Sequence, residues 1–228
     1  MAKIVCLSDT HEMHHKVQVP DGDILIHAGD FCGRGLAASE VGNFLYWLDD
    51  QPHETKIVVP GNHDVILETD DSIRKEFEKS GVHLLIDEEY TNKSSGLKFY
   101  GVPWTPDFYP DLWGFQSRNA PLDYWDRIPE DTDVLISHGP PFGAADQIDP
   151  GNTTDLSSRP KAASVGSAHL GCKRFASVLS DFASPLTIIC GHIHGSYGKH
   201  FLDHHTIYNV SICTELYIPS NTPTVLEL

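Results

Sequence analysis

Short runs of β-branched and other apolar residues recur along this chain, and each breaks off at polar or loop-forming residues. The clearest is Ile57-Val58-Val59, which Pro60-Gly61 ends. An apolar run without polar alternation is typical of a strand that is buried on both faces, and a Pro-Gly pair ends such a strand. We predict strands at residues 3–7, 23–27, 56–59, 82–86, 98–102, 133–137, 186–190, 206–211 and 224–228.

Helical patterns lie between several of these strands. Val41, Phe44, Leu45 and Leu48 form an i, i+3, i+4, i+7 stripe, which indicates an amphipathic helix. Shorter stripes at residues 73–77 and 175–182 indicate two more helices. Strands that alternate with helices predict a layered α/β domain, and closely spaced strands after residue 199 predict mixed sheets. The 228 residues fit one domain better than two.

Charge and cysteine usage narrow the class of protein. The formal net charge of -16 argues against non-specific nucleic-acid binding and against adhesion to an anionic membrane, since both need a basic face. The five cysteines are scattered without CxxC spacing, which favours reduced thiols. No apolar stretch approaches the roughly 20 residues of a membrane-spanning helix, and the N-terminal run is too short for a signal peptide. We therefore expect a cytoplasmic protein that binds no membrane, and the sequence leaves its oligomeric state open.

Two long segments, residues 104–121 and 142–166, lack periodicity. Loops of this length within a compact domain are usually functional, so we predict that both border an active site. The second loop is polar throughout, whereas the first is rich in proline and aromatic residues. Those aromatic side chains either stack a nucleobase or plug the edge of a sheet; they are Trp104, Phe108, Tyr109, Trp113 and Phe115.

Residues that can bind a metal follow five of the predicted strands. They are Asp9 and His11, then Asp30, then Asn62 and His63, then His138, and finally His192 and His194. Ligands of open α/β sheets bind beyond the carboxyl ends of strands, so these five loops are expected to converge. Without His63 the set still holds seven residues, which is too many for one tetrahedral zinc ion but suits two adjacent ions that share a carboxylate. His63 is then free to protonate a departing oxygen as a general acid.

The motifs DTH, GD, GNHD, SHGPP and GHIH, in this order, resemble the five blocks of the calcineurin-like metallophosphoesterases. The phrases GDFCGRG, KIVVPGNHD and FYGVPWTP most resemble the class III phosphodiesterase-like subgroup, which includes the metallophosphoesterase-domain-containing proteins. The resemblance implies one metallophosphoesterase domain over residues 1–228. It also implies a four-layer α/β/β/α sandwich of mixed sheets.

Roles for single residues follow from the same resemblance. Asp9, His11 and His194 would hold one metal ion, Asn62, His138 and His192 would hold the other, and Asp30 would bridge the two. The ions would be Mn²⁺, Fe²⁺/Fe³⁺ or Zn²⁺. A hydroxide that bridges them would attack phosphorus, Arg34 or His63 would contact the phosphate, and Asp30, Asn62 and His63 would form the catalytic set.

The sequence departs from the phosphatase pattern at one position. In the phosphatase form of the second block, GDxxDRG, the later aspartate supports the catalytic imidazole, but here that position is Gly33. A nearby carboxylate favours the protonated ring, so we expect His63 to donate its proton less readily. Asp64 is adjacent but is not counted as a replacement. The departure argues against a protein phosphatase and leaves phosphodiesters open, while the retained His192, which some animal members of the subgroup lack, implies intact activity.

We therefore predict a phosphodiesterase that uses two metal ions and hydrolyses a small phosphodiester such as a cyclic nucleotide. A phosphomonoesterase that acts on a small phosphorylated metabolite is the alternative enzyme. A metal-binding scaffold with vestigial catalysis is the alternative from a different class. Away from the five loops, we expect His27 to be a core histidine and His14 and His15 to be solvated loop residues.

Overall fold

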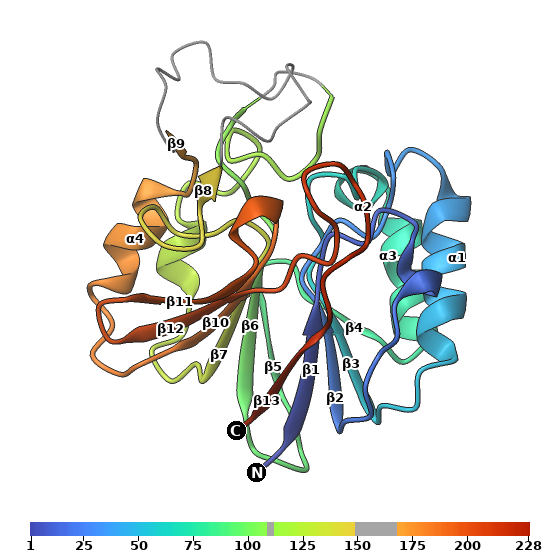
Figure 1. Cartoon of the computed structure of the whole chain (residues 1–228), viewed down its shortest axis with the longest axis horizontal. Coiled ribbons are helices and arrows are strands. Elements are labelled where there is room, and N and C mark those ends of the chain that lie inside the picture. The colour runs from blue at the N-terminus through green and yellow to red at the C-terminus, as the bar shows by residue number, and fades with distance from the viewer. Residues whose placement is uncertain (109–111, 149–167) are drawn as a thin grey trace.

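The computed structural model describes residues 1–108, 112–148 and 168–228 and shows two packed β-sheets with helices outside them (Figure 1). The first sheet has the strand order β13-β1-β2-β3-β4. Its strands are β13 (Thr224–Glu227), β1 (Lys3–Leu7), β2 (Ile24–His27), β3 (Thr55–Val58) and β4 (His83–Leu84). The last strand, β13, runs antiparallel to β1, and the other neighbours are parallel.

The second sheet has the order β11-β12-β10-β7-β6-β5. Its strands are β11 (Gly198–Leu202), β12 (His205–Asn209), β10 (Thr187–Cys190), β7 (Val134–Ser137), β6 (Lys98–Val102) and β5 (Glu88–Thr91). The inner neighbours are parallel, whereas β11 and β5 pair antiparallel at the two edges. A separate antiparallel pair joins β8 (Gln147–Ile148) to β9 (Ala168–His169).

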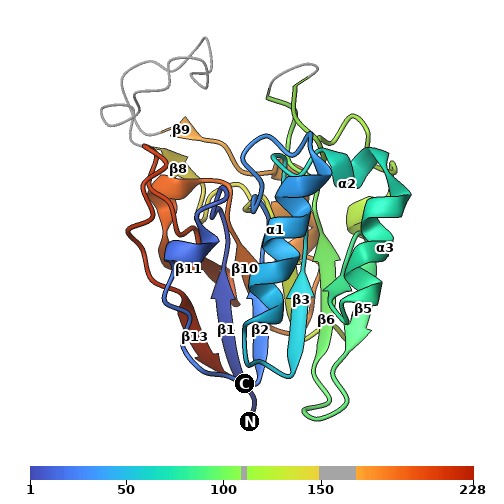
Figure 2. The same cartoon turned by 90° about the vertical axis from the view of Figure 1, so that its right-hand side faces the viewer.

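Helices cover the outer face of each sheet. Figure 1 shows α1 (Ala38–Asp49) and α3 (Asp71–Lys79) outside the first sheet and α4 (Lys173–Leu179) outside the second. A single turn, α2 (Ile66–Thr69), precedes α3, and short 3-10 helices occur at η1 (His14–Lys16), η2 (Tyr124–Arg127) and η3 (His194–Ser196). Figure 2 shows α1 lying across β1, β2 and β3.

Alternating residues of the central strands face two different hydrophobic layers. Val5 and Leu25 pack in the cluster that contains Phe44 of α1, whereas Ile4 and Ile26 pack in a cluster with residues of the second sheet. That inner cluster also includes Ile57, Phe99, Val134, Ile136 and Ile189. Because both faces of these strands are covered, their sequences read as continuous apolar runs. The α/β fold with two mixed sheets is confirmed, and its layers run helix, sheet, sheet, helix.

Most predicted elements agree with the structure. The predicted strands at residues 3–7 and 98–102 match β1 and β6, and the three predicted helices correspond to α1, α3 and α4. The prediction for residues 82–86 was too long, since β4 has two residues. Four strands were missed. β8 and β9 have only two residues each, and β5 and β11 are half-exposed sheet edges whose sequences EEYT and GKHFL contain no continuous apolar run.

The prediction that His14 is solvated is wrong. Its side chain is buried, with ring centroids 5.5 Å from Phe44 and 5.2 Å from Trp47 of α1. The sequence pattern missed this contact because it depends on where α1 packs against η1. His15 is exposed as expected, and His27 lies in the core with Nε2 3.0 Å from the Thr10 hydroxyl.

All five cysteines are unpaired, as predicted, and all five are buried. Within the described ranges, no helix has the length and apolar character that crossing a membrane requires. The predicted loop at residues 104–121 is described except for 109–111. Of the loop predicted at 142–166, residues 149–166 lie outside the described part of the chain, so that prediction is open for them.

Candidate metal centre

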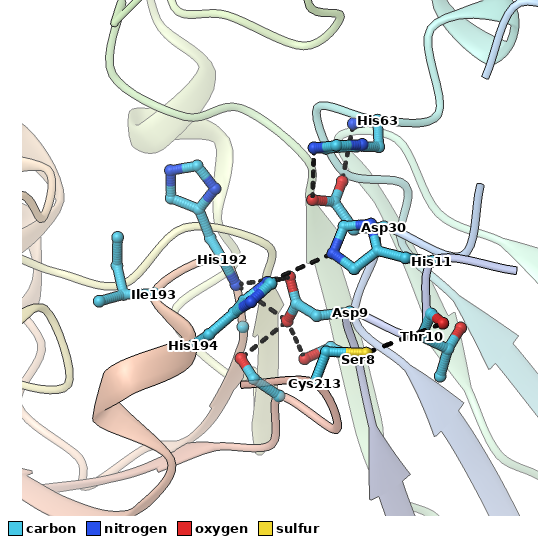
Figure 3. Close-up of polar contacts among 12 residues, drawn as sticks. Ser8, Asp9, Thr10, His11, Asp30, His63, His192, Ile193, His194 and Cys213 are labelled. Atoms are coloured by element: carbon cyan, nitrogen blue, oxygen red, sulfur yellow. Dashed lines mark hydrogen bonds and ion pairs between the residues drawn. The ribbon is translucent and has the colours of Figure 1, made fainter. Parts of the chain in front are cut away.

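The five predicted strand-end loops meet at one edge of the sandwich, beyond the carboxyl ends of β1, β2, β3, β7 and β10. Figure 3 shows residues of the loops that follow β1, β2, β3 and β10 at this edge. Three groups of side chains place their ligand atoms within 4.8 Å of one another. These groups are Asp9 with His11 and His194, His11 with Asp30 and His63, and Asp30 with His138 and His192. The sequence-predicted residues are therefore neighbours, although they come from both sheets.

Four of these residues have a left-handed backbone. The φ angles of Asp9, His11, Asp30 and His192 are 52°, 43°, 57° and 67°. Each such residue costs about 1–3 kcal/mol unless surrounding structure enforces it, and residues of this kind cluster at functional sites. All four residues lie in the loops that follow β1, β2 and β10.

The first group is centred on Asp9. Its Oδ1 lies 3.3 Å from Nε2 of His194, and Nε2 of His194 lies 3.3 Å from Nε2 of His11. Two imidazole nitrogens that face each other at this distance can share at most one proton, and Nδ1 of His11 has no partner among the described residues. Two imidazole nitrogens in this arrangement fit a shared metal cation that is intermediate between hard and soft.

Other groups hold Asp9 in place. Its Oδ2 accepts hydrogen bonds from the hydroxyls of Ser8 at 2.5 Å and Ser211 at 2.8 Å. The backbone N–H of His192 also donates to this carboxylate, at 3.0 Å from Oδ2. Asp9 is fully buried, so these donors compensate for the water that its carboxylate has lost.

The second group is centred on Asp30. Its Oδ1 lies 3.3 Å from Nε2 of His138, and the same nitrogen lies 3.1 Å from Oδ1 of Asn62. His192 completes this group. Asp30 also belongs to the group that contains His11, so its carboxylate stands between the two sets of imidazoles.

Backbone carbonyls orient His138 and His194, the two imidazoles that lie next to these carboxylates. Nδ1 of His138 donates to the carbonyl of Ala28 at 2.8 Å, and Nδ1 of His194 donates to that of Thr214 at 2.9 Å. Each ring therefore presents Nε2 to the centre of the site. Such outer partners fix the tautomer and orientation of metal-binding histidines. The sequence gives no signal for them, because every residue has a carbonyl.

The charges of the site balance within the polypeptide. Burial opposes ionisation, yet His138 and His194 hold the pKa values of Asp30 and Asp9 well below their usual range. Conversely, although burial opposes it, Asp30 raises the pKa of His138 to about 9, and Asp9 raises that of His194. A cation that binds these residues must therefore displace protons from both imidazoles.

The remaining two imidazoles are neutral. Burial lowers the pKa of His11 to about 3 and that of His192 to about 3. A neutral imidazole has the free nitrogen lone pair that a metal ligand needs. With two ionised carboxylates, neutral rings and an amide oxygen converging, the residues fit divalent cations.

His63 lies beside this cluster and is held by a different acceptor from the one in the phosphatase pattern. Its Nδ1 donates to the backbone carbonyl of Gly33 at 2.6 Å, and its backbone N–H donates to Oδ1 of Asp30 at 2.7 Å. Nε2 lies 4.0 Å from Oδ2 of Asp30 (Figure 3). Gly33, which stands where the phosphatase pattern has an aspartate, thus still supplies a hydrogen-bond acceptor for the imidazole of His63 through its backbone carbonyl.

Asp64 does not replace that carboxylate. It is fully buried and accepts hydrogen bonds from the backbone N–H groups of Asp30, Cys32 and Gly61, at 2.9, 2.9 and 2.8 Å. Its role is to tie the second and third strand-end loops together. Arg34 is exposed, so its contact with a phosphate stays a prediction.

Aromatic side chains surround the cluster. The Trp113 ring lies 4.1 Å from His63 between centroids, and Phe108 lies 5.3 Å from His192. Tyr217 lies 4.7 Å from His11 and, like the ligand residues, has a positive φ of 57°. Tyr217 was missed by the sequence reasoning, since its loop after β12 carries no metal-binding motif. Trp104 and Phe115 are buried instead, so the aromatic loop both borders the site and plugs the sheet.

Known proteins resemble this chain over most of its length. The family model for calcineurin-like phosphoesterases matches residues 2–196. Metallophosphoesterase domain-containing protein 1 of Homo sapiens is 36% identical in an alignment 248 residues long, which covers 99% of this chain and 71% of that protein. The UPF0046 protein K07C11.7 of Caenorhabditis elegans is 32% identical over 241 residues, which cover 96% of this chain and 76% of that protein.

A solved structure shares the fold. The crystal structure of TT1561 of Thermus thermophilus aligns with a TM-score of 0.57 at 13% sequence identity, covering 91% of this chain and 88% of that chain. This likeness shows the architecture alone, whereas the family model and the relatives at higher identity show descent. The chain therefore belongs to the calcineurin-like phosphoesterases, metallophosphoesterases that use divalent metal ions.

Proposed function

We propose that this protein is a phosphodiesterase that uses two metal ions and hydrolyses small phosphodiesters such as cyclic nucleotides. The observation that carries the proposal is the position of Asp30, which belongs to two of the three ligand groups. A carboxylate shared between two sets of ligands is what two adjacent ions require. The remaining ligands then divide into Asp9, His11 and His194 for one ion and Asn62, His138 and His192 for the other.

Divalent ions held there would supply Lewis acidity and an activated water for in-line attack on phosphorus. The mixture of imidazoles and carboxylates suits Mn²⁺, Fe²⁺/Fe³⁺ or Zn²⁺. The residues of the chain would hold the ions, and the buried carboxylate of Asp9 keeps its geometry through Ser8, Ser211 and the backbone N–H of His192.

His63 acts as the general acid. The Gly33 carbonyl accepts its Nδ1–H, so Nε2 of the protonated ring is the group that can donate toward the site. As the bond between phosphorus and the leaving oxygen breaks, that oxygen takes the proton from Nε2, and the attacking water leaves its own proton to solvent. General acids of this kind contribute about 10²–10⁴-fold to the rate.

Local charge supports a diester as substrate. Arg34 is the one Lys or Arg among residues 8–14, 28–37, 60–65, 138–142 and 191–197, which form the strand-end loops. A phosphomonoester carries close to two negative charges at neutral pH, whereas a diester carries one. Beyond the charge that bound ions would supply, these five loops add a single cationic side chain, which matches the one negative charge of a diester. We also expect the protein to act in the cytoplasm, where its five unpaired cysteines stay reduced.

The proposal is tested by turnover of bis-p-nitrophenyl phosphate, of p-nitrophenyl phosphate, and of 2′,3′- and 3′,5′-cyclic nucleotides with added Mn²⁺. We expect the diesters to be preferred. Asp30→Ala should lose both bound metal and activity. His63→Ala should keep its metal and lose about 10²-fold or more in kcat on the cyclic nucleotides, whose leaving oxygens need a proton, but little on the p-nitrophenyl esters.

Asp49→Asn, an exposed carboxylate on α1, is the matched control and should behave like wild type. If no activity is found that depends on both metal and Asp30, the enzyme assignment is refuted. A higher kcat/KM for the monoester would make the protein a phosphomonoesterase. Equal metal loss in the Asp30 and His63 variants would show that His63 is a ligand and not an acid.

A further inference from the structure

Among the described residues, the imidazole of His63 makes one hydrogen bond, from Nδ1 to the Gly33 carbonyl at 2.6 Å, and its Nε2 lies 4.0 Å from Oδ2 of Asp30. A single hydrogen bond fixes one ring atom but leaves the plane of the ring to be set by packing. The side chain is buried, so neighbouring rings decide that plane. His11 contacts it edge-on, with centroids 4.5 Å apart and an interplanar angle of 72°.

Trp113 supplies the broad contact. Its ring centroid lies 4.1 Å from that of His63, and the two planes are inclined by 33°. Centroids this close place the two rings in direct contact, with their planes tilted relative to each other, and aromatic rings in contact attract each other. Trp113 therefore restricts the tilt of the imidazole, which the Gly33 carbonyl does not.

The backbone around Trp113 is attached to the loop that carries His63. The next residue, Gly114, donates its N–H to the Asn62 carbonyl at 2.9 Å, and the N–H of Phe115 donates to Oε2 of Glu68 at 2.6 Å. A Cβ atom at Gly114 would lie 3.0 Å from Cα of Val65, so the two segments are in close contact. Trp113 thus has a fixed position relative to His63.

We propose that Trp113 is a positioning residue for His63, holding the imidazole so that Nε2 points at the leaving oxygen. The inference rests on the proposed role of His63 as general acid. In the phosphatase pattern a carboxylate performs the orienting role; here the Gly33 carbonyl and the face of Trp113 divide it. General-acid catalysis depends on hydrogen-bond geometry before it depends on acidity, so loss of the ring contact should lower proton transfer specifically.

The test uses two diesters that differ only in the leaving group, methyl p-nitrophenyl phosphate and methyl phenyl phosphate. p-Nitrophenolate departs without a proton, whereas phenolate is a stronger base and needs one. In Trp113→Leu, which has no flat ring, kcat for the phenyl ester should fall about tenfold or more, while kcat for the p-nitrophenyl ester should change by less than about threefold. Trp113→Phe should restore most of the loss because it restores a face, and Leu112→Ala, an exposed neighbour, should behave like wild type.

A second readout needs neither metal nor turnover. The ring protons of His63 in the metal-free protein should show a ring-current shift in their NMR signals that is lost in Trp113→Leu and kept in Trp113→Phe.

In a His63→Ala background, Trp113→Leu should add no further sensitivity to the leaving group.

Three results would overturn the inference. They are an equal loss of kcat on both esters, a change confined to KM, and the same behaviour of the Leu and Phe variants. If His63→Ala itself shows no sensitivity to the leaving group, the acid role of His63 falls and the inference with it. If His63→Ala shows that sensitivity and Trp113→Leu does not, only the positioning role falls.

Discussion

Asn209 is the residue whose replacement tests the construction of the site most directly. It ends β12, is fully buried, and its Nδ2 donates to the carbonyls of Ile193 at 2.9 Å, Gly191 at 3.3 Å and Ala145 at 3.4 Å. Its Oδ1 accepts the N–H of Ser211 at 3.1 Å. One amide thus secures the loop that carries His192 and His194 to the end of the neighbouring strand.

The cost of Asn209→Ala follows from those contacts. Two of them have ordinary hydrogen-bond lengths, and each buried group left without a partner costs about 1–3 kcal/mol. Water that enters the vacated space recovers part of this, so we expect a loss of about 3 kcal/mol, equivalent to roughly 6–12 °C in Tm for a domain of this size. Asn209→Asp has the same shape but no donor, and it turns a buried carboxylate toward three carbonyl oxygens, so it should cost at least as much.

The assay is urea unfolding in the presence of EDTA, which removes any contribution from bound metal, followed by measurement of metal affinity at the same pH. Outer residues that hold metal ligands typically contribute 10–100-fold to affinity, and we expect a loss in that range for both variants. A free energy of unfolding for Asn209→Ala within about 1 kcal/mol of wild type would refute the reasoning, given the range of costs above. So would an Asn209→Asp variant that is clearly more stable than Asn209→Ala.

Three further predictions follow. Chelation with EDTA should lower Tm, and Mn²⁺ should restore it in a concentration-dependent way, because the candidate ligands come from both sheets and metal binds the folded state. Burial lowers the pKa of His27 to about 3 and that of His14 to about 4, so the unfolded chain binds protons that the folded chain does not. The contribution of these two histidines to the free energy of unfolding should therefore be fully present above about pH 6.5 and be lost below it, by up to about 1.4 kcal/mol per pH unit for each histidine. Urea unfolding in EDTA over that range checks this, and His14→Gln should give a shallower slope. Gly35→Ala should lower stability by about 2–3 kcal/mol, since its φ is +63° and a Cβ would collide with a backbone carbonyl oxygen. In the matched variant Gly33→Ala, the Cβ comes too close only to the movable end of the exposed Glu12 side chain, at 2.6 Å, and makes an ordinary contact with Oε2 of Glu40 at 3.5 Å, so stability and turnover should be close to wild type.

The sequence was sufficient to predict which side chains converge. Asp9, Asp30 and His138 each lie within three residues of the end of a predicted strand. Parallel strands bring their carboxyl ends to one edge, so local pattern and sheet geometry together determine the location. The two outermost strands of the second sheet, β11 and β5, were missed for the opposite reason. An edge strand faces solvent, and its residues need no apolar pattern.

The parts that could not be predicted depend on contacts between segments far apart in the chain. Asn209 has a polar side chain at a strand end, but nothing local shows that it will face three carbonyls of other loops. The contact of Trp113 with His63 depends on how residues 113–116 attach to residues 62–68. The sequence left two roles open for the aromatic loop, and the structure shows Trp113 and Phe108 at the site with Trp104 and Phe115 in the core.

The acceptor that holds His63 is a main-chain carbonyl, and this affects how the site tolerates mutation. An aspartate in that role is lost by a single codon change, whereas a carbonyl belongs to every amino acid that could occupy position 33. What selection must preserve there is the path of the backbone, which Glu40 secures by accepting hydrogen bonds from the N–H groups of Gly33 at 2.8 Å, Arg34 at 3.0 Å and Gly35 at 3.1 Å. Substitutions at Gly35 and Glu40 are therefore the ones that should disturb His63, whereas the side chain at position 33 can change without losing the acceptor.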